Sequence, residues 1–141
     1  MNAAANPRRV VLGLDGSPNS VAALHRAVAE TARLGGTLDA VLVLPASAGP
    51  EAYAAGLRML AGTLSHEYPH GPGVPVNCVV DHGRPADVLV RLADGARLLV
   101  LGAWPDPEAG DVIGGGVVAA CLSRVRCPLA VCAGHGQPTA A

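Results

Sequence analysis

Short apolar runs alternate with longer segments of helical periodicity along nearly the whole chain. The apolar runs are rich in Val and Leu and bounded by turn residues, which predicts strands at 9–14, 38–44, 76–80, 98–102 and 128–132. In the segments between them apolar residues recur at helical spacing, which predicts helices at 18–34, 51–66, 85–93 and about 115–124. Strand and helix therefore alternate.

The predicted strands are continuous apolar runs, a pattern typical of strands that are buried on both faces. Strands separated by helices of this length form βαβ units, whose parallel sheet is covered by helices on both sides. A chain of 141 residues fits one such domain. We predict an α/β domain over residues 9–133, with a flexible N-terminal segment at 1–8 and a flexible tail at 134–141.

Composition and charge narrow the choice of partners. Phe is absent and aromatic residues make up 2% of the chain, so small aliphatic side chains must build the core. The formal net charge is −1, and all ten basic positions are Arg, scattered along the sequence. This pattern disfavours nucleic acid and an anionic membrane as partners. The N-terminus lacks an apolar signal core and no apolar run spans a bilayer, which predicts a cytoplasmic protein.

The four cysteines and five histidines show no spacing typical of metal ligands. We expect the cysteines to be reduced and buried as small hydrophobic residues, and we expect no metal site. Sequence motifs of the common enzymes are missing as well: there is no GxGxxG, no GxxxxGK[ST], no GxSxG and no recoverable Ser-His-Asp or Cys-His arrangement. The chain is therefore predicted not to be an enzyme.

Two loops that follow predicted strands are the candidates for ligand binding. In an open α/β sheet the ligand lies outside the carboxyl ends of the strands, where the strand order reverses. The loop LDGS at 14–17 follows the first strand, and a long glycine-bearing loop at 102–116 follows the fourth. If these two strands are neighbours, the two loops face each other across one crevice.

The chemistry of these loops suits a nucleotide but leaves alternatives open. Asp15 can accept hydrogen bonds from a ribose or an amine, and Gly114, Gly115 and Gly116 would expose backbone N–H groups at a helix N-terminus. Alternatively, Asp15 only caps the next helix and the glycines only form a tight turn. Trp104, the one Trp, would stack on an adenine or pack against its own domain.

Three segments together resemble the universal stress protein family, over about Arg9 to Cys132. They are VVLGLDGSPNS near the start, HGRPADVLVRLA before the fourth strand, and LLVLG…GG…RCPLAV at the end. Gly102 and Gly115 are thirteen positions apart, as in the G-x2-G-x9-G-S/T nucleotide loop of that family.

The resemblance implies a flavodoxin-like, or adenine nucleotide alpha-hydrolase-like, parallel sheet of five strands in the order 3-2-1-4-5. It implies a homodimer through the last strand, from Cys127 to Ala133, and in many members a site for ATP with magnesium. In this chain that site would be formed by the residues that match the family's nucleotide-binding positions: Asp15, the backbone of Val43, Gly102, Gly115, Gly116 and Val117.

The nucleotide loop departs from the family pattern where phosphates would bind. Pro105 replaces the second glycine and Gly116 replaces the Ser or Thr, while Asp106, Glu108 and Asp111 bring negative charge without a basic residue. Two unit charges 4 Å apart interact by about 1 kcal/mol in water and about 4 kcal/mol at an effective dielectric of 20. Such repulsion removes much of a micromolar affinity, which is worth about 8 kcal/mol, unless magnesium bridges the groups.

Three functions follow from these observations. The favoured one is a non-enzymatic stress-response protein that acts as a dimer, contacts other proteins and binds ATP weakly or not at all. The second is an ATP-binding or slowly hydrolysing switch. The third is a nucleotide-dependent ligase or hydrolase that shares the fold, which would require catalytic groups that the sequence does not show.

Overall fold

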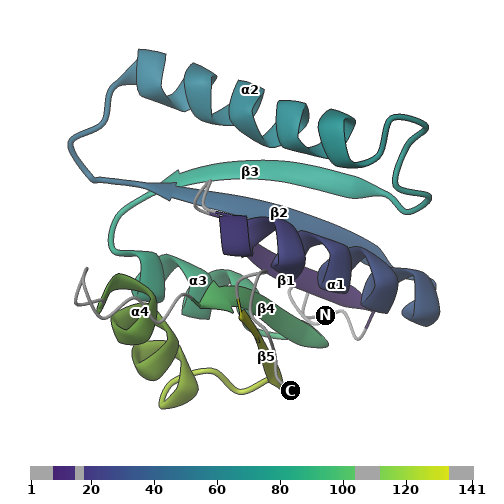
Figure 1. Ribbon diagram of the computed structural model, residues 1–141. Helices are drawn as coiled ribbons and strands as arrows, with labels where there is room; N and C mark the ends of the chain where they lie inside the picture. Colours follow the sequence, from purple (N-terminus) through teal and green to yellow (C-terminus); the bar gives the residue numbers. More distant parts are fainter. Residues whose placement is uncertain (1–7, 15–17, 104–111, 134–141) are drawn as a thin grey trace, which may run out of the picture.

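The computed structural model describes residues 8–14, 18–103 and 112–133 (Figure 1). Strands and helices alternate through these ranges, as the sequence predicts. Their bounds are β1 (Arg9–Leu14), α1 (Pro18–Leu34), β2 (Thr37–Leu44), α2 (Pro50–Glu67), β3 (Val76–His82), α3 (Pro85–Ala93), β4 (Leu98–Ala103), α4 (Val112–Leu122) and β5 (Leu129–Ala133). All nine predicted elements are present, and most begin and end within two residues of the predicted positions.

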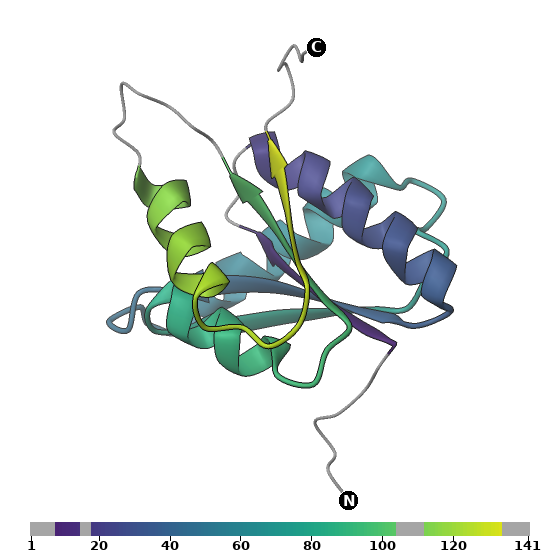
Figure 2. The ribbon, with the colours of Figure 1, turned by 90° about the horizontal axis from the view of Figure 1, so that it is seen from below.

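The strands form one parallel sheet in the order β3-β2-β1-β4-β5, which confirms the predicted fold class. The chain winds outward from β1 to β3 and then returns to the other side of β1, so the order reverses between β1 and β4. Helices α1 and α2 cover one face of the sheet, while α3 and α4 cover the other (Figures 1 and 2).

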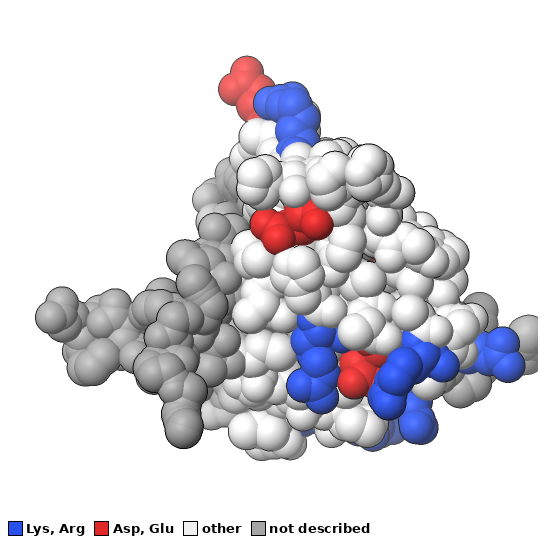
Figure 3. All heavy atoms as spheres, turned by 45° about the vertical axis from the view of Figure 1, so that its right-hand side comes forward, with Lys and Arg blue, Asp and Glu red and all other residues white. Residues whose placement is uncertain are grey.

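Charged side chains are sparse on the face of the molecule that Figure 3 shows. In Figure 3 charged side chains form small groups of mixed sign on a mostly neutral face, with several basic groups gathered in its lower part. Across the described residues, every helix is either too short or too polar to span a bilayer.

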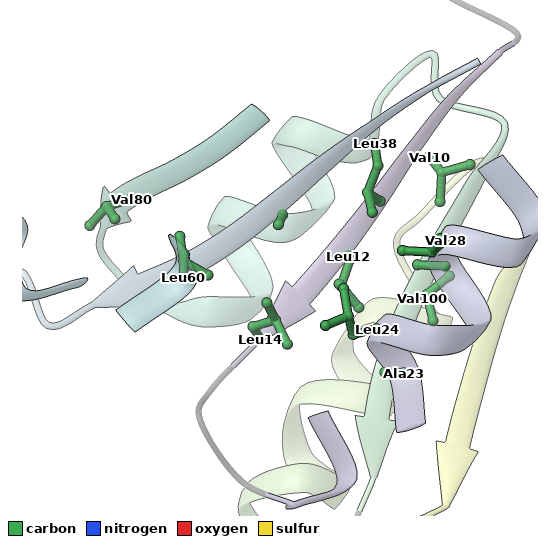
Figure 4. Close-up of a cluster of buried hydrophobic side chains, with 12 residues drawn as sticks. Val10, Leu12, Leu14, Ala23, Leu24, Val28, Leu38, Leu60, Val80 and Val100 are labelled. Carbon is green, nitrogen blue, oxygen red and sulfur yellow. The ribbon is translucent and has the colours of Figure 1, made fainter. Parts of the chain in front are cut away.

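The core beneath α1 and α2 is built from aliphatic side chains of the sheet and the inner faces of the two helices. In Figure 4, Leu24 and Val28 of α1 lie against Leu12 of β1 and Val100 of β4. Twelve buried residues form this cluster: Val10, Leu12, Leu14, Ala23, Leu24, Ala27, Val28, Leu38, Ala40, Leu60, Val80 and Val100. Each Leu side chain buried in this way stabilises the fold by roughly 1.5–3 kcal/mol relative to an exposed one.

Side chains alternate along each strand, so the same strands supply a core on the opposite face. This core is smaller because α3 and α4 are short. Seven buried residues form it: Val11, Val41, Leu89, Ala93, Leu99, Leu101 and Cys121. Leu89 and Ala93 come from α3 and Cys121 from α4, so both helices are anchored through few side chains.

Helix α4 begins at Val112 and ends at Leu122, so the predicted range of about 115–124 is wrong at its start. The three glycines therefore lie inside the helix and do not precede it. Glycine weakens a helix by roughly 0.5–1 kcal/mol per residue relative to Ala, which is why the pattern indicated a loop there. Burial of α4 against the sheet through Cys121 overrides that local preference.

The turn between α1 and β2 uses two adjacent glycines for different reasons. Gly35 has a φ of 64°, the left-handed conformation common after a helix. Gly36 has no room for a side chain, because a Cβ atom there would lie 1.7 Å from the carbonyl oxygen of Arg8. Close approach of the two backbones lets the Thr37 amide donate to that same carbonyl at 3.0 Å and start the pairing of β2 with β1.

Candidate functional site

A cavity of about 120 Å³ lies at the carboxyl ends of β1, β2 and β4, between α3 and α4. Its lining comprises Gly13, Leu14, Ser20, Val41, Val43, Pro85, Leu89, Leu101, Gly102, Val117 and Val118. This is the topological switch point at which open α/β sheets bind ligands. The expectation that the first and fourth strands end at one crevice is confirmed for the described residues.

The floor of the cavity is formed by the paired ends of β1 and β4, where Gly13 lies opposite Leu101. A Cβ atom on Gly13 would lie 2.8 Å from Cδ2 of Leu101 and 3.1 Å from Cδ1 of Leu89. A glycine inside a strand often marks such a close approach. Gly13 therefore allows Leu89 of α3 to pack directly over the sheet beside the cavity.

The predicted site residues have three different outcomes. Val43, Gly102 and Val117 line the cavity, as a shared binding site requires. Gly115 and Gly116 lie within α4. Asp15 lies outside the described residues, as do the loop positions at 104–111 that include the acidic side chains. Binding of a ligand by any of these residues stays a prediction.

The backbone amides of Gly115 and Gly116 do not have the position that the sequence suggested. Only the first few N–H groups of an α-helix lack an intrahelical partner. With α4 beginning at Val112, Gly116 is the fifth helical residue and its N–H points along the helix to a preceding carbonyl. A ligand at the helix N-terminus would have to meet residues closer to Val112.

Several lining residues escaped the sequence reasoning. They are Gly13, Ser20, Val41, Pro85, Leu89, Leu101 and Val118. Gly13 carried a readable signal, since glycine interrupts an otherwise apolar strand. Pro85 and Leu89 are four positions apart and therefore share one face of α3, but nothing local shows that this face closes over the ends of β1 and β4.

The described lining is almost wholly aliphatic and carries no ionisable side chain. Ser20, which is 4% exposed, is its one polar side chain. An open hollow of about 480 Å³ continues from the cavity across the ends of β2 and β3, and it shares Val43 and Pro85 with the cavity. Arg84 lines this hollow and is exposed. The cavity can hold an apolar group, and Arg84 is the cation that the described lining of the adjoining hollow supplies.

The cysteines offer neither a nucleophile nor a metal ligand at this site. All four are free thiols; Cys121 is buried and the others are half-buried. Burial raises the pKa of each of the four thiols, so they are protonated at neutral pH. Within the described residues no three His, Cys, Asp or Glu side chains converge to hold a metal ion.

The chain is similar to one family and to several solved structures. The family model described as "Universal stress protein family" matches residues 6–133. No curated protein matches the chain. Universal stress protein UspA from Lactobacillus plantarum superposes with a TM-score of 0.73 and 20% identity, over 91% of this chain and 99% of that one.

Two further solved structures that resemble this chain are described as complexes with nucleotides. A universal stress protein in complex with cAMP has a TM-score of 0.68 and 26% identity, over 87% of this chain and 94% of that one. A protein from Archaeoglobus fulgidus in complex with dAMP has a TM-score of 0.71 and 18% identity, over 88% of this chain and 96% of that one. The Lactobacillus plantarum and Archaeoglobus fulgidus proteins are only 20% and 18% identical to this chain, so they support the fold alone.

Proposed function

The chain belongs to the universal stress protein family, and we propose that it is a non-enzymatic stress-response protein that acts as a dimer and binds ATP weakly or not at all. Its four free thiols suit a reducing compartment, which favours the cytoplasm as its location. No catalytic constellation is found among the lining residues, which supports a role exercised through binding.

The observation that carries this proposal is the uncharged lining of the cavity. The cavity and the hollow that adjoins it together offer room for a small molecule, so the chemistry of the lining and not its volume limits what binds. A triphosphate also requires cations or converging N–H groups. The described lining of the cavity supplies no cation, two of the predicted glycine amides lie within α4, and the loop sequence adds Asp106, Glu108 and Asp111.

Isothermal titration with ATP and Mg²⁺ tests the nucleotide part of the proposal. We expect a dissociation constant of about 1 mM or weaker, which corresponds to about 4 kcal/mol of binding free energy. The matched variant replaces Asp106 and Asp111 by Asn, and we expect it to bind ATP more tightly because two repulsive charges are removed. A low-micromolar dissociation constant for the unmodified chain would refute weak binding.

A second candidate function is an ATP-binding or slowly hydrolysing switch. It is favoured by the universal stress protein that was solved in complex with cAMP and is 26% identical to this chain. The double variant Pro105→Gly and Gly116→Ser restores the family pattern of the loop. If the scaffold is a nucleotide switch, the unmodified chain binds adenine nucleotides at micromolar concentrations and the restored loop adds little. If binding has been lost, only the restored loop binds, measured by the same titration.

The exposed edge of β5 supports the dimer. This strand ends the sheet, and an unpaired edge invites pairing with another strand. Val131 on β5 is 42% exposed and Leu122 at the end of α4 is 62% exposed. Helix α4 contains no charged or polar side chain, and a helix that is apolar all round is normally buried. A two-fold partner pairing along Cys127 to Ala133 would cover these surfaces.

Light scattering distinguishes the dimer from a monomer of 14.1 kDa. We expect twice that mass at micromolar concentration. Val131→Glu places a charge on the proposed interface and should shift the protein to the monomer. Tyr53→Glu is the matched control, because Tyr53 is 41% exposed on α2, which packs over the opposite half of the sheet. A monomer in the unmodified protein would remove the dimer from the proposal.

A further inference from the structure

The fold gathers arginines that are scattered in the sequence at the amino edge of the sheet, which here means the side where its parallel strands begin. Parallel strands start at the same edge, and β1, β4 and β5 are neighbours. Arg8 directly precedes β1, Arg97 directly precedes β4, and Arg126 lies three residues before β5. All three are exposed. We refer to Arg8, Arg97 and Arg126 as the arginine edge.

Backbone hydrogen bonds hold these segments side by side. The amide of Arg97 donates to the carbonyl of Arg9 at 2.8 Å, which joins the start of β4 to the start of β1. The amide of Leu99 donates to the carbonyl of Pro128 at 3.0 Å, which brings the segment carrying Arg126 beside β4. The spacing of the arginine edge is therefore set by the ladder of the sheet and does not depend on a loop.

The charges around the arginine edge leave it positive. Arg9 is occupied by Asp39 at 3.3 Å and by the carbonyls of Leu92 and Asp94, where it caps the end of α3. Arg124 pairs with Asp87 at 2.7 Å. Among the described residues, no ion pair involves Arg97 or Arg126.

The end of α1 adds to this positive field. Arg33 lies in the last turn of this helix and shares the carboxylate of Glu30 with Arg26 in the middle of the helix, so the three side chains together carry a net positive charge. Because α1 runs back toward the start of β2, its last turn lies at the amino edge (Figure 1). Figure 3 turns this side of the molecule forward and shows basic side chains gathered around one acidic group in the lower part of the view.

We propose that the arginine edge binds an acidic segment of a partner protein. Guanidinium groups match carboxylates in bidentate geometry, and a Glu-rich segment supplies several carboxylates to neighbouring cations. Nucleic acid fits less well, because a duplex-binding surface neutralises roughly 6–10 phosphates. Here Arg97 and Arg126 are without an ion pair among the described residues, Asp39 lies close by on Arg9, and the chain has a net charge of −1.

A labelled Glu-rich peptide, followed by fluorescence anisotropy at low salt, tests this surface on the full chain. Exposed ion pairs are individually weak and are screened by salt, so we expect submillimolar binding that is lost at high ionic strength. The double variant Arg97→Ala and Arg126→Ala should weaken binding by about tenfold. Arg58→Ala with Arg84→Ala removes the same charge from exposed positions elsewhere, and it should change binding by less than about twofold.

Three results would overturn the proposal. The unmodified protein does not bind the peptide at low salt, the edge variant binds as tightly as the unmodified protein, or the control variant weakens binding as much as the edge variant. A duplex of DNA that binds more tightly than the peptide and responds to the same edge variant would assign the surface to nucleic acid instead. Thermal unfolding of both variants verifies that each is folded, since all four side chains are exposed.

Discussion

The two faces of the sheet are built differently although the same strands supply both. Beneath α1 and α2 lie twelve buried residues, and beneath α3 and α4 lie seven. The helices differ in the same direction: α1 and α2 span 17 and 18 residues, whereas α3 and α4 span 9 and 11. The face with long helices is closely filled, and the cavity is on the face with short helices.

The helices of the filled face are also joined to each other by polar contacts. The hydroxyl of Tyr68 lies 2.9 Å from Nδ1 of His25, and Nε2 of His25 lies 2.8 Å from Oε1 of Glu67. Because a carboxylate only accepts, Nε2 donates to Glu67, and Nδ1 forms the second hydrogen bond with the hydroxyl of Tyr68. These contacts tie α1 to α2. The larger cluster and these polar contacts are therefore on one face, and the cavity is on the other.

Truncating one leucine on each face gives the largest expected difference. Leu24→Ala in α1 should lower the free energy of unfolding by about 4 kcal/mol, because Leu24 is fully buried in the large cluster. Leu89→Ala in α3 should cost about 2 kcal/mol, because that side chain already borders the cavity and has fewer contacts to lose. Urea unfolding monitored by circular dichroism measures both.

The comparison between faces would be wrong if the two substitutions cost the same. Leu60→Ala in α2 extends the test, since Leu60 is fully buried and belongs to the same cluster as Leu24. It should resemble Leu24→Ala and not Leu89→Ala.

Adding a methyl group to Gly13, on the floor of the cavity, should change stability less than the leucine truncations do. Gly13→Ala places a Cβ atom 2.8 Å from Leu101 and 3.1 Å from Leu89, so one of these side chains must shift. Overpacking of this kind costs roughly 1–3 kcal/mol, and we expect the lower half of that range because a cavity adjoins both leucines. Any ligand of the crevice should bind more weakly to this variant. Unchanged stability with unchanged ligand affinity would show that the contact is irrelevant.

The fold was predictable because each element carried its own signal. Val10 to Leu14 and Leu98 to Leu101 are continuous apolar runs, and Gly35 ends α1 as expected. The site was predictable only in part, since Val43 and Gly102 follow from the ends of strands. The wall formed by Leu89 depends on how α3 packs over the sheet, and the start of α4 depends on burial overriding three glycines. Both are tertiary effects that a local pattern does not contain.

Helix α4 provides the next test. It lies on the face with the cavity, and its three glycines lower its helix propensity. Gly115→Ala should raise the free energy of unfolding by about 0.5–1 kcal/mol if the residue is helical as observed. The matched control is Gly35→Ala, where a φ of 64° should make the same change destabilising by about 1 kcal/mol. Loss of stability at Gly115 would argue for the tight turn that the sequence pattern indicated.

The smallest effect concerns the ion pairs of the two faces. On the face with the cavity Arg91 donates to Asp81 at 2.7 Å and, with the backbone N–H of His82, holds the pKa of that carboxyl below its ordinary value. On the filled face the corresponding carboxylate is Glu30, whose pKa is lowered mainly by Arg33 on the same helix. Only the first pair joins separate elements, namely β3 and α3.

The pH dependence of stability distinguishes the Arg91–Asp81 pair from the Arg33–Glu30 pair. A carboxylate with a lowered pKa contributes stability above its unfolded pKa, about 3.9 for Asp, and loses it as pH falls through the folded value. Arg91→Ala should therefore cost less than about 1 kcal/mol at pH 7, since the pair is largely exposed, and nothing at about pH 2. Arg33→Ala should cost still less, because its partner is three residues away on one helix. A deficit for Arg91→Ala that grows as pH falls would contradict a stabilising contact between α3 and the sheet.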